Sequence, residues 1–268
     1  MSKIGNYSTS LATLTAFINA EIISQIIEKP QIESMPQKFL YTVLFKLNNG
    51  LNTCSLLFNN LANNSQYADS IFVILRTLIS DSILYLYVLT KSEYDDNKLN
   101  EIIKALYFDH ISFTMEAVKK NFGPIYGKSE EEILLIINEV KRAKPEYFDS
   151  TGNELISPLR ANAYAALRYI ASHRKGGESL TDIQRHYSHY DRFSKYEHIG
   201  DFSFELIHRQ YDDKAVKEIG DEIVDAINLL TITMRSTLGA WPNLDVEVSD
   251  RFNQLLTRLH NSYSQEVK

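Results

Sequence analysis

The chain has 268 residues, a formal net charge of −6 and a single cysteine, Cys54. This length suits one large domain or two small ones, and a hydrophobic content of 44% supplies a core and excludes a disordered chain. One cysteine excludes an intrachain disulfide and favours a reducing, cytoplasmic compartment. The negative charge excludes general attraction to nucleic acid or anionic membranes, so any phosphate site has to be a local basic patch.

Apolar residues recur at spacings of three and four, and no segment alternates with the two-residue period of a strand. The longest loops are expected at residues 143–157 and 199–212, and neither has the composition of a domain linker. These patterns predict an all-α fold, a multi-helix bundle of about nine helices that forms one domain over residues 1–268. In chain order, the helices are expected at about residues 8–28, 37–62, 66–91, 97–121, 130–143, 158–174, 180–196, 212–238 and 245–262.

Local signals mark where several of these helices begin or end. Ser129 and Glu132 form a capping box, in which each side chain satisfies a backbone N–H of the other residue. Pro158 follows Ser157, a pair that predicts a helix starting from a serine N-cap. The cations and glycines after His173 predict a helix end, because cations favour the negative end of the helix dipole.

The most apolar segment, residues 68–90, carries three charged residues: Asp69, Arg76 and Asp81. Three charges make the segment a poor membrane span and a good core helix. No membrane association is therefore expected.

Two of these charges need partners from elsewhere in the chain. Arg76 and Asp81 are separated by about 140° around a helix, so they do not easily satisfy each other. An unpaired buried charge costs several kcal/mol. We expect one of them to meet the segment 186–198, for example through Tyr190 or His198. A buried ion pair without any function is the alternative.

Several motifs of common enzymes are absent. The sequence has no glycine-rich phosphate loop, no G-x-S-x-G, no H-E-x-x-H and no cysteine pair. These absences exclude P-loop NTPases, α/β-hydrolases, zincins and zinc fingers, and no cofactor is expected. Cys54 lies in an apolar helix, where a core thiol is far more common than a nucleophile.

Basic and imidazole side chains concentrate in one region, residues 168–209. Five of the seven histidines fall within 36 residues of this region, together with seven arginines and lysines. In a helix over 180–196, one cationic stripe is formed by Arg185, His189 and Arg192, and we expect it to face outward. The expected core face of that helix contains Ile183, Tyr187, Tyr190 and either Ser194 or Phe193.

An outward stripe of this composition suits phosphate. Arginine offers a planar fork of donors, and histidine exchanges a proton near neutral pH. Arg185, His189 and Lys195 are the candidate phosphate-binding residues. Arginine and histidine without a metal are also sufficient to cleave RNA through its own 2′-hydroxyl. The alternative is that these residues have no function beyond structure and form a solvated surface or an ordinary contact between helices.

A metal site is the rival interpretation of the same helix. Asp182, His186 and His189 stand at i, i+4 and i+7, which places a carboxylate and two imidazoles on neighbouring turns. A fourth ligand would have to come from elsewhere, for example Asp191, His198 or Asp81. No residue in the sequence identifies it, and the predicted site is metal-free.

The segment from Arg192 to His198 resembles the R-x(4–6)-H signature of HEPN domains, which are helical nucleotide-binding and ribonuclease modules of bacterial defence and toxin systems. Arg168 to His173 also fits that spacing, and which pair matters stays open. The resemblance implies that Arg192 binds phosphate and that His198 transfers a proton as the catalytic pair. Because HEPN enzymes usually act as dimers, it also implies a homodimer.

A second resemblance spans roughly residues 36–235. A helix containing Arg76 and Asp81, followed far downstream by the segment Tyr190–His198, is similar to a family of uncharacterised bacterial all-helical proteins. That family pairs an R-x-x-x-E/D helix with a Y-x-x-x-S-x-x-x-H segment. The resemblance implies that Arg76, Asp81 and Tyr190 support the candidate site.

Two functions therefore compete. The first is a HEPN-like, metal-independent ribonuclease or toxin component, with a role in antiviral defence and RNA as its substrate. The second is a non-catalytic helical module that binds a partner protein, a nucleotide or RNA through the same face. A ribonuclease needs Arg192 and His198 to converge on an open cleft, whereas a binding module can bury or separate them.

Overall fold

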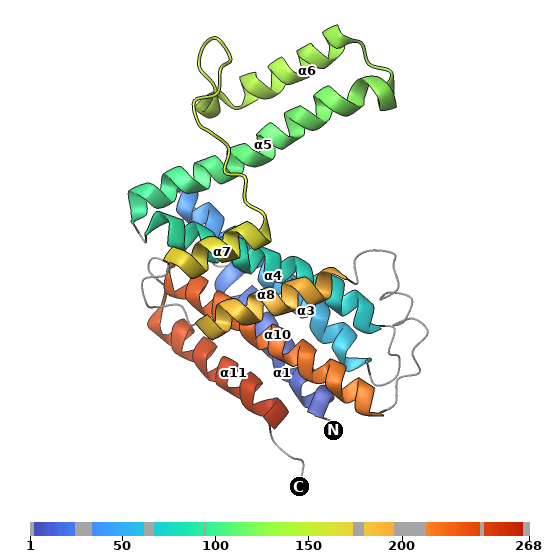
Figure 1. The fold of residues 1–268 in the computed structure, drawn as a ribbon. Coiled ribbons are helices and arrows are strands. Elements are labelled where there is room, and N and C mark those ends of the chain that lie inside the picture. The colour runs from blue at the N-terminus through green and yellow to red at the C-terminus, as the bar shows by residue number, and fades with distance from the viewer. Residues whose placement is uncertain are drawn as a thin grey trace. The chain divides into compact units, whose positions relative to one another are not determined.

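The computed structural model describes residues 3–24, 34–61, 67–93, 95–173, 180–195, 213–241 and 244–264. Within these ranges the protein is all-α and contains no strand, as predicted (Figure 1). In chain order the elements are α1 (Lys3–Phe17), which continues as the π-helix η1 (Ile18–Ile23), then α3 (Met35–Asn59), α4 (Tyr67–Ser92), α5 (Asp96–Tyr126), α6 (Glu130–Ala143), the short 3₁₀ turn η2 (Pro145–Tyr147), α7 (Ala163–His173), α8 (Leu180–Ser194), α10 (Asp213–Gly239) and α11 (Val246–Ser264).

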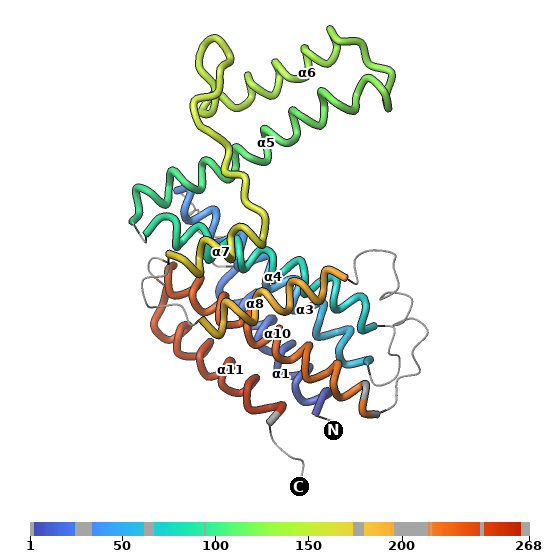
Figure 2. Tube along the Cα trace, in the orientation of Figure 1, coloured from blue at the N-terminus to red at the C-terminus, as the bar shows by residue number. Residues whose placement is uncertain are grey.

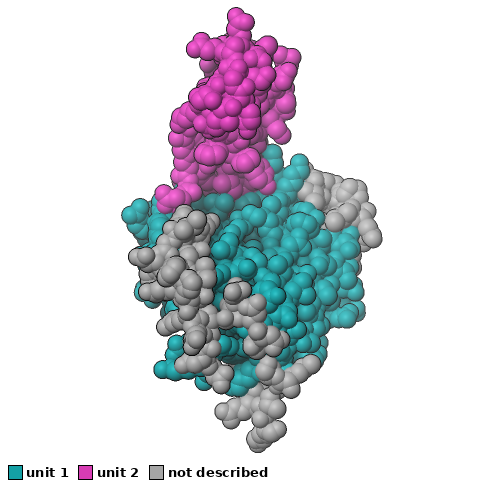
Figure 3. All heavy atoms as spheres, turned by 90° about the vertical axis from the view of Figure 1, so that its right-hand side faces the viewer, with its two compact units in different colours: residues 1–87, 163–268 teal, residues 88–162 magenta. Residues whose placement is uncertain are grey.

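The chain divides into two compact units, whereas the sequence predicts a single domain (Figure 3). Unit 1 combines residues 1–87 with residues 163–268, and unit 2 is the intervening segment 88–162. Each unit contains buried apolar residues of its own. The two are described separately below.

In unit 1, α1 packs against α3 and α11, and α10 packs against α3 and α8. The buried stripe of α1 recurs every three or four residues, through Tyr7, Leu11, Leu14 and Ile18. The Tyr7 ring makes an edge contact with the Phe58 ring, and its hydroxyl donates to the side-chain oxygen of an α10 asparagine at 2.8 Å. This hydrogen bond satisfies a polar group that would otherwise be buried without a partner.

The apolar helix α4 is long and apolar enough to cross a membrane, and it is the one such helix within the described ranges. More than half of its most apolar stretch is buried inside the protein. Its Phe72 ring stacks on Phe193 of α8, and its Ser82 hydroxyl bonds to the ring of His186. These contacts identify α4 as a core helix, as the three charged residues in the segment predict.

Most helix limits lie close to the predicted ones, and the Ser129–Glu132 capping box is confirmed. The prediction of a helix start at Pro158 is wrong, because α7 begins at Ala163. The preceding segment instead bonds to α5: the Leu159 N–H donates to the Ala105 carbonyl at 3.0 Å. These external hydrogen bonds replace the internal ones of a helix turn.

Unit 2 contains α5 and α6, which run antiparallel as a hairpin (Figure 2). α5 ends at Gly127, which adopts a left-handed φ of 65° that favours glycine. One cluster fills the hairpin and the loop after it: Phe108, Met115, Val118, Ile137, Tyr147 and Phe148. Large apolar side chains also remain 56–68% exposed on the same unit: Phe113, Ile125, Tyr126, Leu134, Leu135 and Leu155.

Gly50 allows α3 and α4 to approach closely, and its replacement is expected to destabilise unit 1. A Cβ built at Gly50 would lie 2.6 Å from a methyl carbon of Leu78, a side chain that is itself buried. Gly50→Ala should therefore lower the free energy of unfolding by about 1–2 kcal/mol, since overpacking exceeds the gain in helix propensity. Urea denaturation measures this change.

The matched control is Gly239→Ala, because a Cβ at Gly239 would meet no atom within 4 Å. This control should leave the midpoint of unfolding unchanged or slightly raised. Equal midpoints for wild type and Gly50→Ala would show that α3 and α4 can separate at no cost.

Candidate functional site

The helix α8 lies on α10 and α7, and its buried face differs from the predicted one. Its buried residues are Ile183, His186, His189 and Phe193. The prediction that Tyr187 faces the core is wrong, since Tyr187 is half exposed. The prediction of an outward basic stripe is wrong for His189, which is buried, whereas Arg192 is exposed. The imidazoles lie inside because α4 and α10 supply hydrogen-bonding partners for them there.

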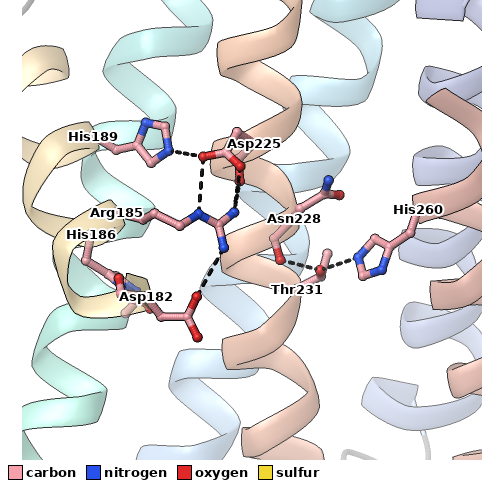
Figure 4. Close-up of polar contacts among 9 residues, drawn as sticks. Asp182, Arg185, His186, His189, Asp225, Asn228, Thr231 and His260 are labelled. Carbon is pink, nitrogen blue, oxygen red and sulfur yellow. Dashed lines mark hydrogen bonds and ion pairs between the residues drawn. The ribbon is translucent and has the colours of Figure 1, made fainter. Parts of the chain in front are cut away.

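Asp225 of α10 holds two of the predicted phosphate-binding residues (Figure 4). Its carboxylate accepts from the Arg185 guanidinium at 2.7 and 3.3 Å, and it pairs with Nε2 of His189 at 2.8 Å. Arg185 also donates to the Asp182 carboxylate at 3.1 Å. The hydrogen bond from His189, with those from Arg185, lowers the pKa of Asp225 to about 2 despite partial burial. Asp225 is therefore a fixed negative charge at neutral pH.

The other cations of this segment are paired as well. Nε of Arg192 lies 2.8 Å from the Glu222 carboxylate of α10, and Nζ of Lys195 lies 3.3 Å from Asp191. Burial raises the pKa of Glu222. Every arginine and lysine between residues 180 and 195 thus has a carboxylate partner within unit 1.

His186 forms a separate, fully buried contact between three helices. Its Nδ1 lies 2.8 Å from the Asp182 carbonyl oxygen, and its Nε2 lies 2.9 Å from the Ser82 hydroxyl of α4. A carbonyl only accepts, so Nδ1 carries the proton and Nε2 accepts from Ser82. The Ser82 oxygen also contacts the Thr233 hydroxyl of α10. Burial lowers the pKa of His186 to about 4, so its ring is neutral at pH 7.

These contacts remove the metal interpretation of Asp182, His186 and His189. Both ring nitrogens of His186 are already engaged, and His189 bonds to Asp225. Across the described ranges, no group of three or more His, Cys, Asp or Glu side chains is arranged to hold a metal ion.

The predicted contact between the charged apolar helix and α8 is confirmed for Arg76. Its guanidinium carbon lies 5.3 Å from the centre of the Tyr190 ring, within the range of a cation–π interaction. Asp81 has a different partner, because it forms an ion pair with Lys46 of α3 at 2.7 Å. The Tyr190 ring also makes an edge contact with Tyr164 of α7.

Only part of the predicted catalytic pair can be placed. His198 lies outside the described residues, as do Arg174, Lys175 and His208. Arg192 is described, and 59% of its side chain is exposed. In the alternative pair, Arg168 and His173 are both exposed on α7, and Nδ1 of His173 lies 3.0 Å from the Tyr169 carbonyl oxygen.

The sequence analysis missed the acidic half of this site. Asp225 lies 36 residues beyond His189, and Glu222 lies one turn before it on α10. Both carboxylates interrupt the apolar stripe of that helix, which contains Ile223 and Ile227. The sequence does contain a signal for this half of the site: carboxylates beside a buried apolar stripe require basic partners from another helix.

The site therefore holds neutralised pairs between α8 and α10, together with one exposed arginine. No protein-family model matches the chain, and no curated protein or solved structure is similar to it. The resemblance to HEPN domains stays a prediction from the sequence.

Proposed function

We propose that this protein is a non-catalytic helical module that binds a partner protein through the α5–α6 hairpin of unit 2. The observation that carries the proposal is the concentration of exposed apolar side chains on that hairpin. Five side chains of the hairpin, and Leu155 in the loop that follows it, are 56–68% exposed between residues 113 and 155. Large exposed apolar groups of this kind mark interaction surfaces on soluble proteins.

These exposed side chains are distinct from the buried apolar residues that form the core of unit 2. On α6, Ile137 is buried, whereas Leu134 and Leu135 are exposed. On α5, Phe108 is buried and Phe113 is exposed. Both helices thus carry large apolar groups that their shared cluster does not bury.

The ion pairs of the α8 cations support the same proposal, because they disfavour the rival function of binding phosphate at α8. A phosphate group would have to displace Asp225 from Arg185 and His189, or Glu222 from Arg192. Displacement would leave a carboxylate close to the incoming phosphate, and like charges repel. Binding of a phosphate backbone is therefore unfavourable at this cluster.

The partner is expected to be lost when charge is placed on the hairpin. After chemical crosslinking in its native cells, the tagged wild-type chain should retain one enriched protein, and Leu134→Glu/Leu135→Glu should not retain it. Mass spectrometry identifies the protein, and circular dichroism checks that the variant is folded. A second copy of this chain in the crosslinked product would identify the homodimer that the HEPN resemblance implies.

Leu56→Glu is the matched control, because Leu56 is equally exposed but belongs to unit 1. It should retain the partner. An identical set of crosslinked proteins for wild type, control and hairpin variant would contradict the proposal.

The second candidate is the HEPN-like, metal-independent ribonuclease of antiviral defence. One observation favours it: the Arg192 side chain is mostly exposed, and its ion pair with Glu222 uses Nε, which leaves the outer edge of the guanidinium toward solvent. Pure protein would then cleave total RNA equally with and without EDTA. His198→Ala would then reduce the cleavage rate by about 10²–10⁴-fold, the loss typical of a general acid or base, without lowering the melting temperature.

A further inference from the structure

A cavity of about 460 Å³ lies between the C-terminal half of α6 and the loop that follows it, inside unit 2. Its polar lining includes Asn138, Lys141 and Arg142 of α6 and Ser150 of the loop, and Pro145 and Phe148 form an apolar wall. A volume of this size is typical of small-molecule sites. The cavity is separate from the α8–α10 pairs, which belong to unit 1.

The loop is held in one conformation by its own hydrogen bonds. The Asp149 carboxylate accepts from the N–H groups of Thr151 and Asn153 at 2.8 and 2.9 Å and from both of their side chains. Lys141 donates to the Gly152 carbonyl at 2.6 Å and lies over the Phe148 ring. The cavity wall is therefore preorganised, which reduces the entropy lost on binding.

Three exposed polar side chains line the cavity and form no hydrogen bond or ion pair with the residues that the structure describes. They are the Asn138 amide, the Arg142 guanidinium and the Ser150 hydroxyl. All three can donate hydrogen bonds, and the guanidinium presents a planar fork that matches phosphate oxygens. In contrast to the arginines of α8, Arg142 has no carboxylate partner within the described part of the chain.

The charge of the lining also favours an anion. Lys141 and Arg142 contribute two positive charges and Asp149 one negative charge, which leaves a net charge of +1 in a protein of net charge −6. The oxygens of Asp149 face donors of their own loop, so this carboxylate is occupied. The site offers free hydrogen-bond donors, a net positive charge and an apolar wall. These features suit a ligand with an anionic group attached to an apolar or planar body.

We propose that this cavity binds a small phosphate ester of mononucleotide size, with the phosphate on Arg142, Asn138 and Ser150. The body of the ligand lies against the exposed Pro145. The proposal is independent of the partner-protein function, because it uses neither the exposed leucines of α6 nor α8.

The test is isothermal titration calorimetry of the full chain with adenosine monophosphate, adenosine and inorganic phosphate. The monophosphate should bind more tightly than either fragment, since it uses both walls. Arg142→Ala should weaken binding at least about tenfold, because it removes a charge-assisted, bidentate contact. Ser150→Ala should weaken binding by a smaller factor.

Lys119→Ala is the control, because it removes an exposed positive charge from α5 of the same unit without touching the cavity. It should bind the monophosphate like the wild type. No binding by the wild-type chain, or equal affinity for wild type and Arg142→Ala, overturns the proposal. Binding of a phosphoserine peptide but not of the monophosphate would overturn the small-molecule class and assign the cavity to a protein ligand.

Discussion

Replacing His186 by alanine is expected to lower the free energy of unfolding by about 3–5 kcal/mol, the largest loss for a single side chain of this site. The ring is 2% exposed, so its removal leaves a cavity between α4, α8 and α10. It also leaves the Ser82 hydroxyl and the Asp182 carbonyl without the partners that they have at 2.9 and 2.8 Å. The cavity and the lost hydrogen bonds both lower the free energy of unfolding.

Chemical denaturation at pH 7 measures this loss, with Ser188→Ala as the control because Ser188 is exposed on the same helix. The control should stay within about 0.5 kcal/mol of the wild type. A His186→Ala protein as stable as the control would show that the three-helix contact contributes nothing.

The same histidine predicts how stability depends on pH. Its folded pKa of about 4 lies below the usual value near 6.5, so the unfolded state binds a proton first as the pH falls. The stabilisation is therefore complete above pH 6.5 and is lost between about pH 6.5 and 4, by about 3 kcal/mol in total. His186→Ala should flatten this part of the profile, which denaturation across that pH range measures.

Replacing Asp225 by alanine is expected to cost about 2–3 kcal/mol, because one carboxylate holds both Arg185 and His189. The side chains that lose their partner are only 28% and 10% exposed, so water replaces the carboxylate poorly. Asp225 itself is half exposed, which keeps the loss below that of a fully buried pair.

A double-mutant cycle separates the interaction energy of Asp225 with Arg185 from the other effects of each substitution on stability. Asp225→Ala and Arg185→Ala should together cost clearly less than the sum of the single losses, because each variant removes the same interaction. Glu218→Ala is the control, since Glu218 is exposed on the same helix and its ion pair with Lys214 is long, at 3.9 Å. Strictly additive losses would show that Asp225 and Arg185 do not interact in solution.

Acid provides an independent test of Asp225. Its folded pKa of about 2 lies below the usual value, so its stabilising effect is present above about pH 4 and is lost as the pH falls toward 2. The wild-type protein should therefore lose more stability than Asp225→Ala in that range. Because His186 titrates at higher pH, the two contributions are separable in one profile.

The buried imidazoles and their partners explain why a histidine-rich helix need not be an active site. His186 joins α8 to α4, and His189 joins it to α10. Each ring fills space like an apolar side chain and also satisfies a hydroxyl or carboxylate on another helix. Such contacts select one packing of the three helices, since any other packing leaves polar groups unsatisfied.

The sequence by itself determined where the helices lie and which residues of α4 need partners. Periodicity and capping depend on neighbours within a few residues, so α6 is predicted at its observed limits and the Ser129 cap is recovered. The expected meeting of Arg76 with Tyr190 follows from the cost of an unpaired buried charge, which is a property of the residue type.

Tertiary structure alone decided which face of α8 is buried. By composition, tyrosines look apolar and histidines polar, so periodicity placed Tyr187 inside and His189 outside. The reverse arrangement is stable because Ser82 and Asp225, distant in the chain, satisfy the imidazoles. The cavity beside Arg142 was unpredictable for the same reason, since a loop that folds back onto α6 creates it. Local sequence encodes helices, but whether a polar side chain is buried depends on partners that only the fold brings together.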